Sequence, residues 1–274
     1  MQVNPTETLR RAGALLLALG IAGCAKPTIQ DEEEIGRQQA TQVRQQLLVL
    51  HDDVITNYVD EIGQRLVHAS GPQPFEYTFT VVQDDTLNAF AGFGGQIYVH
   101  TGMITRTRNV SELAGVIGHE IGHVVKRHMA DNYQKAQNAG LLKNAAVIGA
   151  IFGGVNPGAV DLLGDLALMG ALNTFSRENE SEADEFAVDL LPRAGYDPTG
   201  IATMFEVLAG SEHRRPPKFF SSHPTSPERV AATRELIASR KLPEDLRRDD
   251  NGRLEIIQAR IRLLTGERSK PKPR

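Results

Sequence analysis

The segment His119-Glu120-Ile121-Gly122-His123 constrains the fold of this chain more than any other part of the sequence. It lies in an aliphatic stretch that predicts one buried helix over about residues 111–135. Four residues of a helix turn the side chain by about 400 degrees, so His119 and His123 project from one face and can share a metal ion. Glu120 points about 100 degrees away, which suits a group that handles a water molecule beside the metal. The alternative is an ordinary helix that carries two histidines.

A catalytic zinc site needs a third protein ligand. A third histidine ten residues after the first is excluded, because position 129 is Met129 and His128 lies about 180 degrees around the helix from His119. The acidic segment 176–193 offers Glu180 and Asp184 one turn apart. Glu180 can therefore bind the metal while Asp184 accepts the free ring N–H of a ligand histidine. The other acids of this segment are assigned to a solvated face: Glu178, Glu182 and Glu185.

The N-terminus has the order of a secretory signal. Arg10 and Arg11 precede an apolar stretch that ends in Ile21-Ala22-Gly23-Cys24. This resembles a bacterial lipobox and predicts cleavage before Cys24 and lipidation of its thiol; a plain signal peptide or a buried free thiol is the alternative. Because Ala25 follows instead of aspartate, we expect a lipid anchor in the periplasm, with the outer membrane favoured over the inner membrane.

Composition excludes several other classes. The chain of 274 residues is 41% hydrophobic and 23% charged, with a net charge of -4, which argues against a nucleic-acid-binding or disordered protein. A single cysteine excludes an internal disulfide. Alternating β-branched and aromatic residues predict two early strands, at 75–82 and 96–100. Helical patterns predict an otherwise helical chain, with helices at about 31–50, 53–70, 176–193, 198–210, 226–239 and 252–265.

Five blocks of the sequence, in order, resemble the gluzincin metallopeptidases of family forty-eight, the family of HtpX and the CaaX prenyl endopeptidase. The blocks are Leu87-Asn88-Ala89-Phe90-Ala91, Gly94-Gly95-Gln96-Ile97-Tyr98-Val99, the His-Glu helix, Ser176 to Asp184, and Ser221-Ser222-His223-Pro224 with Arg229. The resemblance covers about residues 50–235. Within the family, the sequence resembles the short periplasmic lipoprotein type, since the membrane-spanning helices of the membrane members are not evident.

The resemblance implies an α+β, mainly helical fold: a gluzincin core with a small early sheet and a zinc-binding active-site helix. It implies one Zn²⁺ per chain held by His119, His123 and Glu180, with Glu120 as general base. His223 is the candidate donor to the oxyanion. Its alternatives are a fourth zinc ligand that closes the site or a structural loop histidine. Arg229 supports the same oxyanion or pairs with an acid.

The resemblance also implies a substrate-binding strand. Gln96, Ile97 and Tyr98 resemble the family's edge strand, which binds an extended polypeptide through main-chain hydrogen bonds. Asn88 and Ala89 are expected beside the scissile bond. Recognition of this kind reads the backbone more than the side chains, so we expect unfolded or extended polypeptides as substrates.

These inferences divide the chain into four parts: a lipoprotein signal peptide (1–23), a lipidated N-terminus with a leading helix (24–50), a metallopeptidase domain (51–265) and a disordered basic tail (266–274). The apolar interval 141–172 is expected to be a lid or a buried hairpin, with a membrane contact or a partner surface as alternatives.

The expected function is a zinc-dependent endopeptidase of the bacterial cell envelope. It would cleave unfolded or misassembled membrane proteins in quality control, with polypeptide substrates, possible envelope protein partners and no nucleic acid. Two alternatives remain: a zinc-bearing, chaperone-like lipoprotein scaffold that binds without cutting, and a zinc hydrolase of non-peptide substrates. The intact Glu120 argues against the scaffold, because a structural zinc site needs no base.

Overall fold

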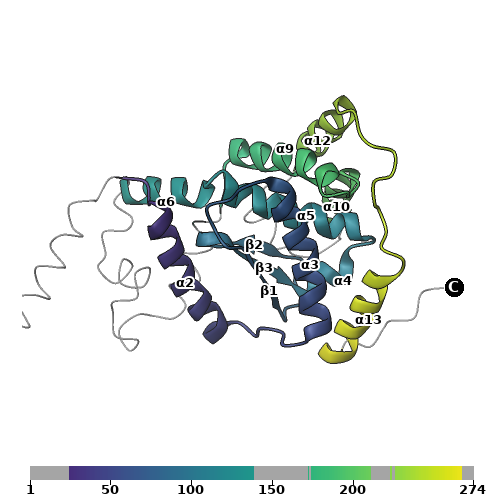
Figure 1. Ribbon diagram of the computed structural model, residues 1–274, viewed down its shortest axis with the longest axis horizontal. Helices are drawn as coiled ribbons and strands as arrows, with labels where there is room; N and C mark the ends of the chain where they lie inside the picture. Colours follow the sequence, from purple (N-terminus) through teal and green to yellow (C-terminus); the bar gives the residue numbers. More distant parts are fainter. Residues whose placement is uncertain (1–24, 139–171, 173, 211–222, 224–225, 267–274) are drawn as a thin grey trace, which may run out of the picture.

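The computed structural model describes residues 25–138, 172, 174–210, 223 and 226–266 (Figure 1). In these ranges the protein is mainly helical with one small, early sheet, which confirms the predicted fold class. The predicted signal peptide, Cys24, nearly all of 141–172 and the tail beyond Gly266 lie outside the described residues. The elements are α2 (Ile29–Gln46), α3 (Asp53–Ser70), β1 (Thr78–Val82), β2 (Ala89–Ala91), the 3₁₀ turn η1 (Phe93–Gly95), β3 (Gln96–His100), α4 (Thr101–Arg106), α5 (Val110–Val125), α6 (His128–Asn138), α9 (Arg177–Arg193), α10 (Thr199–Gly210), α12 (Pro227–Ser239) and α13 (Arg253–Thr265).

The sheet has the order β1-β3-β2, with β3 in the centre. β3 pairs in parallel with β1 and antiparallel with β2. The expectation that Gln96 to Val99 forms an edge strand is therefore wrong, because strands occupy both of its sides. The sequence did not predict β2, whose three residues include two alanines, a residue with low strand propensity. β1 and β2 form the two edges of the sheet.

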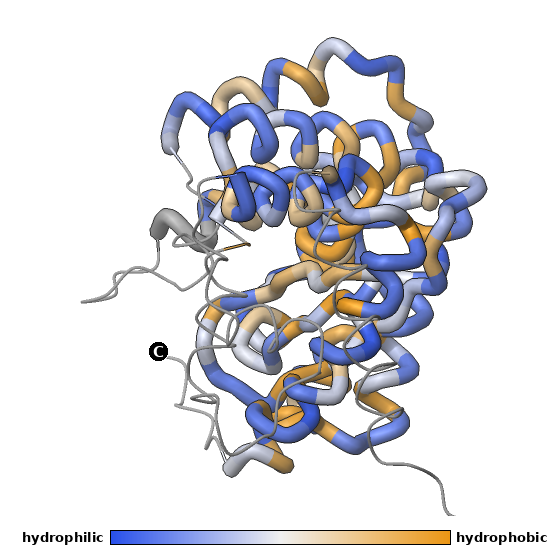
Figure 2. Tube along the Cα trace, turned by 90° about the vertical axis from the view of Figure 1, so that its left-hand side faces the viewer, coloured by the Kyte–Doolittle hydropathy of each residue, from blue (hydrophilic) through white to orange (hydrophobic). Residues whose placement is uncertain are grey.

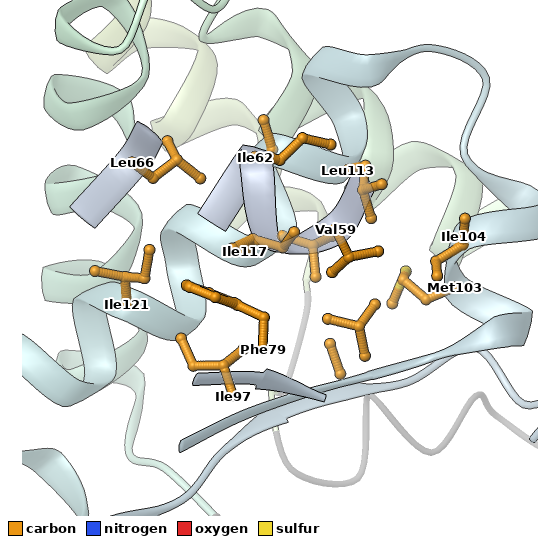
Figure 3. Close-up of a cluster of buried hydrophobic side chains, with 14 of the residues drawn as sticks. Val59, Ile62, Leu66, Phe79, Ile97, Met103, Ile104, Leu113, Ile117 and Ile121 are labelled. Atoms are coloured by element: carbon orange, nitrogen blue, oxygen red, sulfur yellow. The ribbon is translucent and has the colours of Figure 1, made fainter. Parts of the chain in front are cut away.

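One face of the sheet packs against α3 and α5 (Figure 3). Phe79 and Ile97 project from β1 and β3 into the space below Ile62, Ile117 and Ile121. A strand directs alternate side chains to opposite faces, so the neighbouring positions of these strands turn away from that core. The buried helix α5 is thereby held between the sheet on one side and other helices on its far side.

α2 packs on the other face of the sheet, where Val43 joins Val82 and Tyr98 in a second cluster. The helix approaches the backbone of η1 closely, since a Cβ at Gly36 would lie 2.3 Å from the carbonyl oxygen of Phe93. The leading helix is therefore an integral part of the folded unit.

The predicted helix over 111–135 is two helices, and this prediction was wrong. α5 ends at Val125 and α6 begins at His128, with Arg127 between them in the left-handed region at a φ of 57°. That conformation costs a non-glycine residue about 1–2 kcal/mol. Arg127 is held there by an ion pair with Glu32 of α2 and a hydrogen bond to the carbonyl of Pro27. These long-range contacts cannot be inferred from helical periodicity.

α9, α10 and α12 lie on the far side of α5, and α13 packs against α3 and α4 (Figure 1). Hydrophobic and hydrophilic residues are interspersed along the helical parts of the described chain (Figure 2). Among the described helices, none is long and apolar enough to cross a membrane.

Glycines let the neighbouring helices approach α5, and one pair of variants tests this. A Cβ at Gly115 would lie 2.9 Å from the backbone nitrogen of Ile201 in α10, whereas at Gly118 its nearest neighbour is 3.8 Å away. Overpacking costs about 1–3 kcal/mol, and alanine recovers up to about 1 kcal/mol of helix propensity. We expect Gly115→Ala to lower the free energy of unfolding by about 1–2 kcal/mol in urea denaturation. The matched control Gly118→Ala should not lower it, and equal losses in both would contradict the packing described.

Candidate metal centre

Four side chains that are distant in the sequence converge at one buried point. His119 and His123 come from α5, Glu180 comes from α9, and His223 lies between α10 and α12. One ligand atom from each lies within 4.8 Å of all the others. α9 reaches this position because Gly122 of α5 packs against its backbone, where a Cβ would lie 3.1 Å from the Cα of Ala183.

The distances between these atoms are close to those of a zinc site. Tetrahedral zinc binds nitrogen and oxygen at about 2.0–2.2 Å, which places its ligand atoms about 3.3–3.6 Å apart. The Nε2 atoms of His119 and His123 are 3.0 Å apart, and His123 Nε2 is 3.3 Å from Glu180 Oε1. Two imidazole nitrogens that both present lone pairs in a buried site repel unless a hydrogen or a metal ion holds them together. The donor set therefore suits a bound metal ion.

The orientation of His119 has a clear cause. Its Nδ1 lies 2.9 Å from Asp184 Oδ1, so this nitrogen carries the hydrogen and Nε2 presents its lone pair to the other ligands. Burial lowers the pKa of His119, but hydrogen bonds to Asp184 and Glu180 outweigh it and raise the pKa to about 9. The two carboxylates thus favour a positive charge at this point, which a metal ion supplies.

Arg229 holds these carboxylates from the other side. It donates two hydrogen bonds to Asp184, at 2.6 and 2.7 Å, and forms an ion pair with Glu180. Its guanidinium also lies over the ring of Phe205, 4.5 Å from the centroid. Burial raises the pKa of Asp184, but the hydrogen bonds from Arg229 and His119 outweigh burial and lower the pKa below its ordinary value. The carboxylate therefore stays charged. Of the two predicted roles for Arg229, this geometry is that of pairing with an acid.

Glu120 lies beside the four ligand atoms without joining them. Its side chain is buried, and its Oε1 is 3.4 Å from His223 Nε2. Burial raises the pKa of Glu120, while His223 and His119 act in the opposite direction. A carboxylate with a raised pKa next to a metal site is a stronger base than an exposed one, which suits it to accept a proton from water.

His223 lies inside the donor set. Its Nδ1 is 2.9 Å from Glu180 Oε1 and 3.3 Å from His119 Nε2, and the side chain is fully buried. This is the position of a fourth ligand. A donor aimed at a developing oxyanion would instead lie at a distance from the other ligand atoms.

The residues predicted to bind substrate fall into two groups. Asn88 and Ala89 lie on or next to β2, and the backbone of Ala91 in the same strand acts to lower the pKa of Glu120. Ile97 and Tyr98 are instead buried in the central strand, and Gln96 accepts a hydrogen bond from Thr78 of β1. Only the first group therefore belongs to the strand whose Ala91 adjoins Glu120.

Sequence reasoning missed three side chains that surround the ligands. The Phe175 ring stacks on His123 with its centroid 3.8 Å away, and Phe205 meets His119 edge-on. His128, which had no predicted role, lies 2.9 Å from His123. Phe175 directly precedes Ser176, whose side chain caps α9; a hydrophobic residue before a capping box is a known signal that could have identified it.

The fold and the site together define the gluzincin class, in which two histidines of one helix and an acid of a later helix bind zinc. The chain belongs to peptidase family M48, whose model matches residues 55–237. This confirms the family inferred from the sequence blocks, and zinc is the metal that the family and this buried donor set support.

Curated relatives agree with this assignment. The beta-barrel assembly-enhancing protease of Yersinia pestis is 32% identical over 235 residues, which are 84% of this chain and 48% of the relative. The metalloprotease YcaL of Escherichia coli (strain K12) is 36% identical over 182 residues, 66% of this chain and 69% of the relative. The mitochondrial metalloendopeptidase OMA1 of Schizosaccharomyces pombe is 30% identical over 188 residues, 66% of this chain and 53% of the relative. The chain spans about half the length of the beta-barrel assembly-enhancing proteases that it matches.

Arg229 gives a test of the charge balance in the site. Arg229→Met leaves two buried carboxylates without their cation, and breaking a buried ion pair costs about 3–5 kcal/mol. We expect a loss of this size in the free energy of unfolding, measured in urea with a zinc chelator present. Arg240→Met, which removes the exposed pairing with Asp189, is the matched control and should cost less than about 1 kcal/mol. Equal losses in the two variants would count against the role given to Arg229.

Proposed function

We propose that this protein is a zinc-dependent endopeptidase of the bacterial cell envelope that cleaves unfolded or misassembled envelope proteins. One observation carries the proposal. The metal ligands His119, His123 and Glu180 converge in a buried site that also holds Glu120, a carboxylate with a raised pKa that is not itself a ligand.

The residues have distinct roles in this proposal. Bound zinc acts as a Lewis acid and lowers the pKa of water to about 7. Glu120 takes the proton from the attacking water and passes it to the leaving amine. Asp184 fixes the tautomer of His119, and Arg229 keeps Asp184 and Glu180 charged and in place.

The substrate lies along β2. The carbonyl of Asn88 and the N–H of Gly92 bond to β3, so alternation directs the main-chain groups of Ala89 and Ala91 to the opposite edge, towards Glu120. An extended polypeptide added at this edge passes beside the ligands. Because this recognition uses main-chain groups, it favours unfolded segments as substrates and does not select for particular side chains.

The cellular setting rests on the N-terminus and on the relatives. We place the protein in the periplasm, anchored through a lipid on Cys24, with the outer membrane favoured and envelope proteins as partners. The residues of the lipobox support the anchor. The names of the enteric relatives, beta-barrel assembly-enhancing protease, support substrates among proteins that assemble in the envelope.

Glu120→Gln tests the activity. Loss of the general base should reduce cleavage of casein by about 100- to 10,000-fold while zinc content stays at one per chain. The comparison uses the native protein and the variant at equal zinc content. If the native protein binds zinc and cleaves neither casein nor an unfolded outer-membrane protein, even after His223→Ala, a scaffold that binds without cutting becomes the better explanation.

His223 is proposed to close the site as a fourth ligand, and its removal tests this. His223→Ala leaves three protein ligands and an open position, so zinc should be retained. If closure is favoured by about 1 kcal/mol, casein cleavage should rise by about sixfold. His51→Ala, at an exposed position, is the control and should be neutral. Reduced cleavage with zinc retained would instead assign His223 to the oxyanion.

A further inference from the structure

A chain of two hydrogen bonds leads from His123 to the surface of the protein. The Nδ1 of His123 lies 2.9 Å from the Nδ1 of His128, and the Nε2 of His128 lies 3.0 Å from Glu182 Oε2. The first contact is fully buried and the second is partly exposed, since the Glu182 side chain is 45% exposed. His128 occupies this place because the break at Arg127 turns the chain. Five residues along an unbroken helix, it would lie about 140 degrees away from His123.

The positions of the hydrogens in this chain follow from counting donors and acceptors. His123 faces the other ligands with Nε2, so a metal there requires the lone pair of Nε2 and leaves the hydrogen on Nδ1. Two nitrogens 2.9 Å apart need one donor and one acceptor, so the Nδ1 of His128 accepts. Its hydrogen is then on Nε2, which points at Glu182, a carboxylate that only accepts. Every contact in the chain is satisfied by this single arrangement.

We propose that Glu182 and His128 are positioning residues for the metal site, and that they fix the tautomer of His123 through these two hydrogen bonds. His119 has its own carboxylate partner in Asp184, so the two ligand histidines are oriented independently, one directly and one through a second imidazole. This rests on the zinc-binding part of the proposed function. It does not depend on peptidase activity, because its test measures zinc and hydrogen positions.

Variants of Glu182 separate this role from a general effect of charge. Glu182→Lys replaces an acceptor by a donor, which favours the opposite arrangement of hydrogens in both histidines. Glu182→Gln keeps a carbonyl oxygen that can accept from His128. Glu178→Lys makes the same change of charge at an exposed position of the same helix and is the matched control.

The first measurement is the zinc affinity of the full-length protein, by competition with a chromophoric chelator. Loss of such outer contacts weakens metal binding about 10- to 100-fold. We expect this loss in Glu182→Lys, and values close to native in Glu182→Gln and Glu178→Lys. His128→Leu, which removes the acceptor, should match Glu182→Lys, and His128→Asn should recover affinity, because its Oδ1 can take the place of the imidazole Nδ1.

The second measurement is ¹⁵N NMR of the histidine rings, which shows which nitrogen carries the hydrogen. In the native zinc-bound protein the hydrogen should be on Nδ1 of His123 and on Nε2 of His128. A hydrogen on Nδ1 of His128 would overturn the proposal, as would equal zinc affinities for Glu182→Lys and Glu178→Lys. If both results are as expected but neither casein nor an unfolded outer-membrane protein is cleaved, even after His223→Ala, the peptidase is contradicted and this inference stands.

Discussion

The contact between α5 and α9 determines what the rest of this structure can do. Gly122 lies one residue before His123, and the missing side chain there lets the backbone of Ala183 approach. This approach brings Glu180 to the two histidines and Asp184 to the far side of His119. The sheet, α3 and α10 all pack around α5 and so hold this helix in place. A shift of one helix against the other would separate the ligands while leaving each helix intact.

The site combines several charged groups that would be costly to bury singly. Glu180 and Asp184 are buried next to Arg229, and the remaining balance is met by the metal ion for which the ligands are arranged. A network of this kind constrains geometry more than it adds stability, because each buried charge requires a partner in a fixed direction. The hydrogen bonds that orient both histidines extend this constraint outward.

Local patterns in the sequence predicted much of this arrangement. The helix over 53–70 matches the structure because its buried residues recur at steps of three and four. The strand over 96–100 also matches, although it is buried on both faces and does not alternate. The spacing of His119 and His123 on one helix and of Glu180 and Asp184 on another was sufficient to select the residues that the structure brings together. Periodicity alone could not show β2, a strand of three residues, or the break at Arg127, which depends on contacts with α2. The same break explains why His128 was passed over, since an unbroken helix would have carried it away from the ligands.

The attachment of the N-terminal segment at Arg127 would also limit where the enzyme works if it carries the proposed lipid anchor. Pro27 accepts a hydrogen bond from Arg127, and Lys26 forms an ion pair with Asp131 of α6 at 2.7 Å. With a lipid on Cys24, only two or three residues separate the membrane from a folded surface, a reach of about 10 Å. An anchor this short leaves little freedom to search the surrounding volume. The catalytic domain would stay at the membrane surface and act on polypeptides that pass close to it.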